Sequence, residues 1–425
     1  MYKVGLISDI HYDIYDNKGS QYKEDIKNAL DFFKKEGVDC IMSCGDICNY
    51  QDEDLQGFYK LYKPYFDKGM RFYTCLGNHD YMRLYEGGVN KENLWQTNVA
   101  SLHCIPGATE NIEKDIHFFE YGAKWNAPQR TGTRNAHSKQ NFWFEKEGDI
   151  YVFISVDYKE SNGNVNGLSQ AINLLDKTNP YVSQIKKYVK DTPYNESKEK
   201  NFDYRFYDPE VLIWLKDILE ANTDKKVFVF SHHFFPHKAG NGNSLNNKWF
   251  YSQLRVWPYT TNTAVNARYY AGSNTLCGIE FWFLNKLNNT HKNSCWFSGH
   301  SHIQIADNIY QKDITFCNSD YEVVQPDGKE TTPLVDDIWT LRGGPNDYKR
   351  YTRKNDTPIN TCGLNIHLSS LSKPLTISST TAQTLYKASE GMIMEVYNDG
   401  VKFKPIVFKR DTDNTYIDDI KEGSE

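Results

Sequence analysis

Residues 71–80 read RFYTCLGNHD, and the organisation of the chain follows from this stretch. Its first six residues are mostly aromatic, β-branched or apolar, which is typical of a buried strand, and the strand ends at Gly77. Three polar side chains follow in a row, an amide at Asn78, an imidazole at His79 and a carboxylate at Asp80. Because Gly-Asn is also a common turn dipeptide, the stretch by itself leaves a turn and a functional site open.

Four other strand-like runs end in residues of the same kind. They end in Asp9-x-His11, Gly45-Asp46, His232-His233 and Gly299-His300-x-His302. Amphipathic patterns typical of helices separate the runs that end at Asp9, Asp46 and Gly77, which predicts an α/β fold with a parallel sheet and right-handed crossovers. Ligands of such sheets bind outside the carboxyl ends of the strands, so we expect these residues to share one site.

Local signals mark further elements beyond this first unit. Asp208-Pro209 is an N-cap followed by proline at the first helical position, which predicts a helix with a buried face from Val211 to Leu219. Asp399-Gly400 between two apolar runs predicts a hairpin. Residues 314–316 are typical of a strand, whereas 325–360 are loop-like, with proline, glycine and charges.

The domain organisation is predicted from length and from the distribution of periodic segments. The 425 residues exceed the usual size of one domain, but no internal repeat or low-complexity linker divides them. We therefore expect one large domain over residues 1–410 and a polar tail over 411–425. Long insertions are expected at about 82–141, 159–206, 234–275 and 325–360.

Charge and cysteine usage narrow the function classes. A net charge of −6 argues against a nucleic-acid partner and against an anionic membrane surface. The nine cysteines are odd in number, form no Cys-x-x-Cys pair and partly lie in apolar runs, which indicates a reducing compartment. With no signal sequence and no apolar stretch of about 18 residues, the chain is expected to be cytoplasmic and not membrane-bound.

The strand ends together supply aspartate, asparagine and histidine but no cysteine. Oxygen and imidazole ligands combined suit Mn, Fe, Zn or Ni rather than Mg or Ca. Seven or more candidate ligands are too many for one ion, so the pattern predicts a dinuclear site with a shared carboxylate. Each histidine alone is more often structural, and the prediction rests on the joint pattern.

In this order, the five blocks resemble the calcineurin-like metallophosphoesterases. The resemblance covers residues 3–305 and continues more weakly at 362–368 and 390–392. It implies a sandwich of two mixed β-sheets flanked by helices (α/β/β/α). One departure is visible: the second block usually reads Gly-Asp-x-x-Asp, and the last position here is Asn49. The family's aspartate there supports the loop and does not bind metal.

The resemblance also implies a set of ligands and a reaction. The first ion would be held by Asp9, His11, Asp46 and His302, and the second by Asp46, Asn78, His232 and His300. His232 is preferred to His233, because the family's ligand is usually the first of such a pair. The implied reaction is hydrolysis of a phosphate mono- or diester by a metal-bridging hydroxide. His79 would act beside the substrate, and Asp80 would fix its tautomer.

We expect the long loops after the strand ends to determine which substrate binds. The expected partner is a small-molecule phosphate ester. Arg255, Arg268 and Tyr269 lie in one aromatic-rich loop and are candidate substrate-binding residues. An ordinary surface insertion is the alternative for this loop, and it is favoured. Two other functions compete: a nuclease, against which the acidic balance argues, and a catalytically silent protein-binding scaffold, against which the complete ligand set argues. Monoester or diester specificity and the oligomeric state stay open.

Overall fold

The computed structural model describes the parts of the chain that form its two large sheets, their helices and the intervening strand ends. These are residues 1–13, 19–48, 52–77, 80, 116–119, 141–155, 179–192, 207–232, 279–291, 293–300, 321–324, 338–341, 348–353, 364–368, 370–372, 375–377, 383–385, 389–398, 400–408 and 415–416. Among them, no helix is both long enough and apolar enough to cross a membrane.

The first sheet has six strands in the order β17-β16-β15-β1-β2-β3. Its strands are β1 (Tyr2–Ile7), β2 (Cys40–Ser43), β3 (Arg71–Thr74), β15 (Ser389–Tyr397), β16 (Gly400–Phe408) and β17 (Thr415–Tyr416). Strands β1, β2 and β3 are parallel, and α1 (Gly19–Lys35) and α2 (Asp52–Phe66) connect them, as predicted. The predicted hairpin is confirmed by the antiparallel pairing of β15 with β16 down to Tyr397 opposite Gly400.

The second sheet also has six strands, in the order β12-β8-β7-β6-β5-β4. They are β4 (Ile116–Phe118), β5 (Phe142–Lys146), β6 (Asp149–Ile154), β7 (Val227–Ser231), β8 (Ser294–Ser298) and β12 (Leu364–His367). Strands β6, β7, β8 and β12 are parallel, whereas β5 and β4 are antiparallel additions at one edge. Both sheets are therefore mixed.

The two sheets pack face to face around a shared apolar layer. Leu6 and Met42 of the first sheet are in the same buried cluster as Phe153 and Phe230 of the second. Within the second sheet, directly paired positions carry rings that stack across the strands, with centroids 4.6 Å apart for Phe142 and Phe153 and 4.7 Å apart for Phe153 and Phe230. This aromatic row fills the interface beneath the strand ends.

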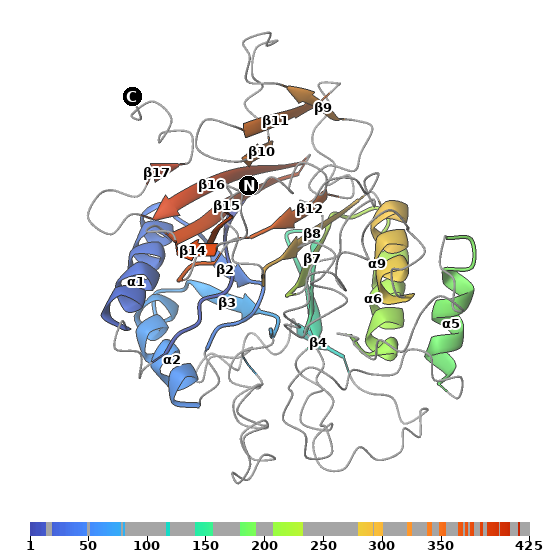
Figure 1. Cartoon of the computed structure of the whole chain (residues 1–425), viewed down its shortest axis with the longest axis horizontal. Coiled ribbons are helices and arrows are strands. Elements are labelled where there is room, and N and C mark those ends of the chain that lie inside the picture. The colour runs from blue at the N-terminus through green and yellow to red at the C-terminus, as the bar shows by residue number, and fades with distance from the viewer. Residues whose placement is uncertain are drawn as a thin grey trace.

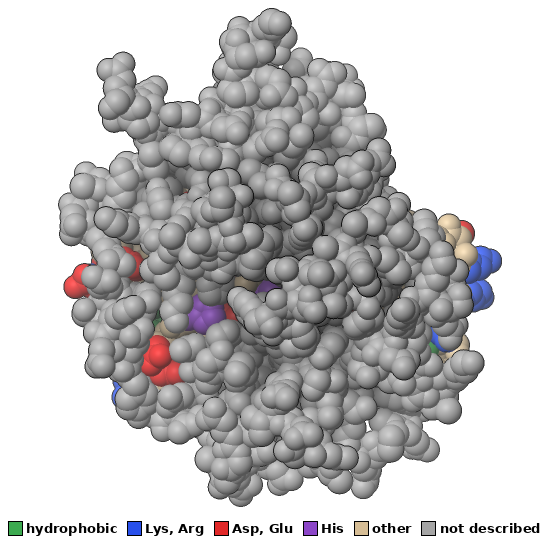
Figure 2. Space-filling view, viewed as in Figure 1, with side chains coloured by type: hydrophobic (Ala, Val, Ile, Leu, Met, Phe, Trp, Pro, Cys, Tyr) green, Lys and Arg blue, Asp and Glu red, His purple; other side chains and the backbone are tan. Residues whose placement is uncertain are grey.

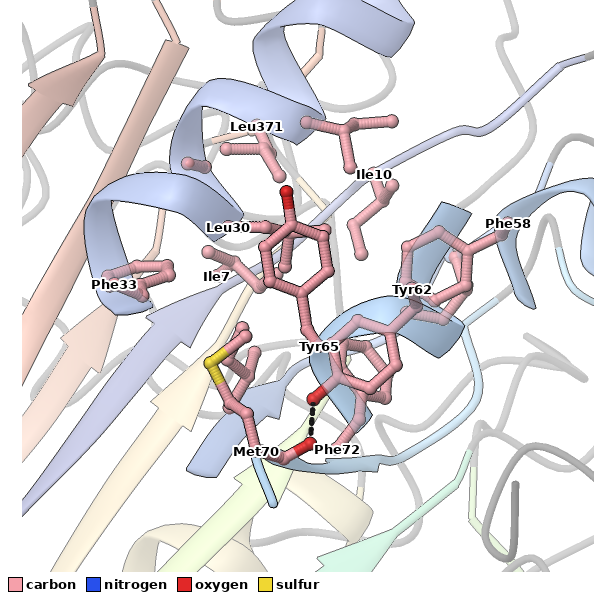
Figure 3. Packing of buried hydrophobic residues seen from close by; sticks show 14 of the residues in the cluster. Ile7, Ile10, Leu30, Phe33, Phe58, Tyr62, Tyr65, Met70, Phe72 and Leu371 are labelled. Atoms are coloured by element: carbon pink, nitrogen blue, oxygen red, sulfur yellow. Dashed lines mark hydrogen bonds between the residues drawn. The ribbon is translucent and has the colours of Figure 1, made fainter. Parts of the chain in front are cut away.

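Helices cover the outer face of each sheet (Figure 1). On the first sheet, Leu30 and Phe33 of α1 and Phe58 and Tyr62 of α2 pack on the strands (Figure 3). The hydroxyl of Tyr62 is buried and donates to the Met70 carbonyl at 2.6 Å. The outer face of the second sheet carries α5 (Pro180–Tyr188), α6 (Pro209–Ala221) and α9 (Ile279–Thr290). The predicted fold class, two mixed sheets between helices, is confirmed.

Helix α6 forms where the sequence predicts it. The Asp208 side chain accepts a hydrogen bond from the Glu210 N–H, and Pro209 occupies the first helical turn, where a missing N–H costs nothing. Val211, Leu215 and other members of its apolar face are buried against the second sheet. The cap and the apolar spacing thus fix both the start of α6 and the face that it buries.

Smaller elements complete the described structure, and some of them lie within segments that were predicted as insertions, loops or tail. A three-stranded sheet joins β9 (Tyr321–Val324), β10 (Ile338–Leu341) and β11 (Tyr348–Arg353), and a two-stranded one joins β13 (Leu375–Ile377) to β14 (Gln383–Leu385). The prediction that 325–360 is loop-like is therefore wrong at β10 and β11, because these short strands form by pairing, β10 with β11 and β11 with β9. Elements β4, α5 and β17 likewise fall within 82–141, 159–206 and 411–425. The predicted strand at 314–316 and the 234–275 insertion lie outside the described residues.

Candidate metal centre

The carboxyl ends of four strands bring five predicted ligands together. Asp9 and His11 follow β1, Asp46 follows β2, His232 follows β7 and His300 follows β8. They form two groups, Asp9-His11-Asp46 and Asp46-His232-His300, and within each group one ligand atom per residue lies within 4.8 Å of the others. All five are buried, and Asp46 belongs to both groups. Asp46 is therefore the residue that the two groups share, and it joins ligands that follow strands of both sheets.

Four of these residues have a left-handed backbone. The φ angles are 51° at Asp9, 45° at His11, 51° at Asp46 and 73° at His300. Among the described residues, only Glu147 joins them as a non-glycine with positive φ. Such a conformation costs on the order of 1–3 kcal/mol per residue and persists only where the surroundings enforce it, which is common at functional sites. This strain distinguishes the strand ends from ordinary turns.

Backbone hydrogen bonds between the β1 and β2 ends hold this geometry. The Asp9 N–H donates to the Gly45 carbonyl at 3.0 Å, and the His11 N–H donates to the Asp46 carbonyl at 2.9 Å. Tyr12 continues the pattern by donating to the Ile47 carbonyl at 2.9 Å. Two loops that would otherwise be independent are thus paired as an irregular extension of the parallel sheet.

One oxygen of Asp46 lies between histidines of the two groups. Its Oδ2 is 3.7 Å from Nε2 of His11 and 3.2 Å from Nε2 of His232. Oδ1 of Asp9 is 3.8 Å from Nε2 of His11, and Nε2 of His232 is 3.1 Å from Nδ1 of His300. Carboxylate oxygens and imidazole nitrogens therefore converge in two adjacent places, as ligands of two neighbouring ions do.

The ring of His232 is oriented by a main-chain carbonyl. Its Nδ1 lies 2.7 Å from the Cys44 oxygen, and because a carbonyl only accepts, Nδ1 carries the proton. In the neutral ring, the lone pair of Nε2 then points toward Asp46 and His300, which is how outer partners orient metal-binding histidines. Burial lowers the pKa of His232, but Asp46 and Asp9 raise it more strongly, to about 9. The same negative field would hold a metal cation.

Asp9 is anchored through both its side chain and its carbonyl. Its Oδ2 accepts from the Ser8 hydroxyl at 2.6 Å and from the His300 N–H at 2.9 Å, while its Oδ1 faces His11. The Asp9 carbonyl accepts from the hydroxyls of Ser370 at 2.8 Å and Ser372 at 3.4 Å. The sequence reasoning missed these two serines. Their signal is a polar run directly after β12, a strand parallel to β8 in the same sheet.

Two glycines allow the strand ends to approach closely. A Cβ on Gly77 would overlap Oδ1 of Asp46 and lie 2.8 Å from Cδ2 of His232. A Cβ on Gly299 would overlap the side chains of Ser8 and Asp9. Any larger residue at either position must displace candidate ligands. The glycines of the predicted blocks are therefore part of the site.

Asp80 lies beside this centre and contacts its backbone. Its carboxylate accepts hydrogen bonds from the N–H groups of Asp46, Ile47, Cys48 and Gly77. Burial and the nearby Asp46 carboxylate raise the pKa of Asp80, whereas the N–H groups of Gly77 and Cys48 lower it. The predicted partner of Asp80, His79, lies outside the described residues, and so do Asn78, His302, Arg255, Arg268 and Tyr269.

Histidine and acidic side chains gather near the middle of the face shown in Figure 2. Side chains coloured as lysine or arginine appear mainly at the edges of this view, most clearly at the right (Figure 2).

This chain is similar to one protein family and to several solved structures. Residues 2–180 match the family model described as calcineurin-like phosphoesterase. Two solved structures are similar along 98% of this chain. One is a dimetal phosphatase from Danio rerio, with 12% identity and a TM-score of 0.37, of which 98% is covered. The other is a purple acid phosphatase from yellow lupin (Lupinus luteus) seeds, with 11% identity and a TM-score of 0.36, of which 52% is covered. No curated protein matches the chain. The resemblance that the sequence predicts is confirmed by the match of residues 2–180 to the family model of calcineurin-like phosphoesterases.

Proposed function

We propose that this chain hydrolyses a small-molecule phosphate mono- or diester at a dinuclear metal site. The family match supports a metal-dependent phosphoesterase. The observation that carries the finer proposal is the position of Asp46, whose Oδ2 lies between His11 of one ligand group and His232 of the other. A carboxylate shared in this way suits a pair of ions rather than two separate sites.

The residues fit ions that accept both oxygen and nitrogen ligands. Buried aspartate and histidine without cysteine suit Mn, Fe, Zn or Ni. In the proposal, the first ion is held by Asp9, His11, Asp46 and His302, and the second by Asp46, Asn78, His232 and His300. When bound, such a pair supplies Lewis-acid stabilisation of a phosphate oxygen and a water acidified to a pKa of about 7.

The protein's own groups complete the site. The Cys44 carbonyl holds His232 in one tautomer, and the Ser8 hydroxyl and His300 N–H orient Asp9. His79, which directly precedes Asp80 in the sequence, is proposed to stabilise the developing charge or to protonate the leaving oxygen. A net charge of −6 favours a small phosphate ester over nucleic acid. Arg255, Arg268 and Tyr269 stay candidates for contacts to the rest of the substrate.

The domain organisation and the location of the protein also stay proposals. The apolar cluster shared by the two sheets supports a single domain over residues 1–410. Cys40, Cys44, Cys48 and Cys75 are free and buried, which is compatible with the proposed cytoplasmic location.

The test is turnover of generic phosphate esters by protein loaded with defined metals. We expect hydrolysis of a nitrophenyl monoester, a bis-nitrophenyl diester or both after loading with Mn or Ni, with two ions per chain by elemental analysis. The ratio of the two rates decides between monoester and diester. Protein that binds two ions but turns over neither ester contradicts the proposal.

A matched pair of variants links turnover to the shared carboxylate. Asp46→Asn weakens a ligand of both ions, so both are expected to be lost together with activity. Asp67→Asn changes a half-exposed aspartate at the end of α2 and is expected to alter neither metal content nor rate. Loss of one ion only in Asp46→Asn argues against a bridging role.

A further inference from the structure

The carboxylate of Asp80 collects four backbone N–H groups from two loops. Oδ2 accepts from Gly77 at 2.8 Å and from Asp46 at 3.0 Å, and Oδ1 accepts from Ile47 at 2.9 Å and from Cys48 at 3.3 Å. The Cys48 thiol adds a longer contact to Oδ1 at 3.5 Å. An ionised carboxylate has about four positions that accept hydrogen bonds, and the four N–H groups occupy them. A further bond to His79 would have to share a position that a backbone N–H already uses.

Three of the donors belong to consecutive residues, and the first of them, Asp46, carries the shared carboxylate. The N–H groups of Asp46, Ile47 and Cys48 point at one anion, as in a backbone nest. Gly45 and Asp46 both have positive φ, at 96° and 51°, which produces this turn. Hydrogen bonds from N–H groups to a charged acceptor are stronger than neutral ones. Asp80 therefore offsets the strain at Asp46 and holds the backbone from which the Asp46 side chain extends.

The fourth donor links this turn to the neighbouring strand. Gly77 follows β3, and its N–H shares Oδ2 of Asp80 with the N–H of Asp46. Gly77 is also the residue whose Cα approaches the Asp46 carboxylate so closely that no Cβ fits. One carboxylate thus sets the distance between the end of β2 and the end of β3, where the candidate bridging ligand lies.

We propose that Asp80 is a positioning residue for Asp46, and through Asp46 for both metal ions, rather than the partner of His79. The inference rests on the proposed function, because it assigns a role toward ions that the proposed function introduces. It differs from the expectation drawn from the sequence, in which Asp80 sets the tautomer of His79. The two roles predict different defects when the carboxylate is removed.

Asp80→Asn separates the two roles. The amide replaces one acceptor oxygen by an NH₂ donor that faces N–H groups, so at least two of the four bonds are lost. Because Asp46 is common to both ions, Mn(II) affinity is expected to fall about 10–100-fold at both sites, the range for outer partners of ligands. The exchange-coupled electron paramagnetic resonance signal of a Mn pair is expected to be lost in parallel. Thermal unfolding of the metal-free protein checks that the variant is folded.

Two further variants complete the experiment. Asp67→Asn is the control for the same substitution at a half-exposed aspartate, and its Mn titration is expected to match the unchanged protein. Asp80→Glu keeps the charge and both acceptor oxygens on a longer side chain, so partial recovery of Mn affinity is expected. If Asp80→Asn does not fold, Asp80→Glu is titrated alone, and weaker binding at both ions is expected; binding equal to the unchanged protein overturns the proposal.

The outcomes distinguish this inference from the proposed function. If Asp80→Asn binds two Mn ions with unchanged affinity and coupling but loses turnover and the acid limb of its pH profile, Asp80 acts on His79 and the inference is wrong. If the unchanged protein itself binds no Mn pair, the proposed function fails first.

Discussion

Asp46 and His232 lie 3.2 Å apart, measured from Oδ2 to Nε2, although they belong to different sheets. Asp46 follows β2 of the first sheet, and His232 follows β7 of the second. Their distance therefore depends on how the two sheets pack, and not on the local sequence of either loop. Gly77 lies beside both residues and permits this approach.

Gly77→Ala is expected to abolish binding of both metal ions. The new Cβ would overlap Oδ1 of Asp46 and lie 2.8 Å from Cδ2 of His232, so both side chains must move. Elemental analysis of purified protein measures the loss. Gly69→Ala is the control, because Gly69 has positive φ at 95° but nothing within 4 Å of an added Cβ. It is expected to lower stability and to keep the ions. Full metal content in Gly77→Ala would contradict this geometry.

Ser370→Ala is expected to weaken metal binding by the group that contains Asp9. The serine hydroxyl donates to the Asp9 carbonyl at 2.8 Å, and one such bond contributes about 1 kcal/mol, which corresponds to a several-fold change in affinity. Calorimetric titration with Mn(II) measures it. Ser372→Ala removes the longer bond of 3.4 Å and is expected to have the smaller effect. The reverse order of the two variants would show that neither serine acts through this carbonyl.

His79→Ala is expected to keep both ions and to lose most of the turnover. His79 is not a ligand in the proposed scheme, and removal of a general acid typically costs about 10²–10⁴-fold in rate. Parallel measurement of metal content and of nitrophenyl ester hydrolysis checks this. If an ion is lost with the histidine, His79 belongs among the ligands and the assignment must be changed.

Phe153→Ala is expected to lower the free energy of unfolding by about 3–5 kcal/mol, the usual cost of truncating a buried phenylalanine. The ring is fully buried and stacks on Phe142 and Phe230 in the row between the sheets. Urea unfolding of the metal-free protein measures the change. Phe153→Leu keeps most of the volume and is expected to cost less, about 1.5 kcal/mol or below. Equal losses in the two variants would mean that the cavity is not the cause.

Stability is expected to fall as the pH drops below about 6.5, in part because of His291. Burial lowers the pKa of this histidine, and Lys216 lowers it further, while Glu220 opposes them. Since the unfolded chain then binds the proton more readily, the contribution of His291 is present above the unfolded pKa of about 6.5 and is lost toward the lower folded value.

Urea unfolding between about pH 5 and 8 tests this contribution, because histidine changes its charge in this range. His291→Gln is expected to flatten the acid side of the stability profile. His117→Gln is the control, because His117 is exposed on the edge strand β4. Identical profiles for the unchanged protein and His291→Gln would exclude His291 as a source of the slope.

The sequence by itself determined the strands that lead into the site, the helices between the first three of them, and the side chains that stand at their carboxyl ends. Apolar runs and caps are local signals, so β1, β2, β3 and α6 could be predicted from them. The same local character explains the failure at β10 and β11, where short strands are stabilised by pairing with other strands and carry little signal of their own.

Only the tertiary structure decided how these side chains are arranged around Asp46. The left-handed backbone at Asp9 and Asp46, the four N–H groups on Asp80 and the serine hydroxyls on Asp9 all join loops that are distant in the chain. The bonds on Asp80 depend on how β2 and β3 lie side by side in the first sheet, and the serine bonds to Asp9 depend on how the second sheet packs on the first. No single loop encodes either arrangement. A sequence motif can therefore predict the ligands, but the proposed role of Asp80 follows from the four N–H groups that bind its carboxylate in the folded protein.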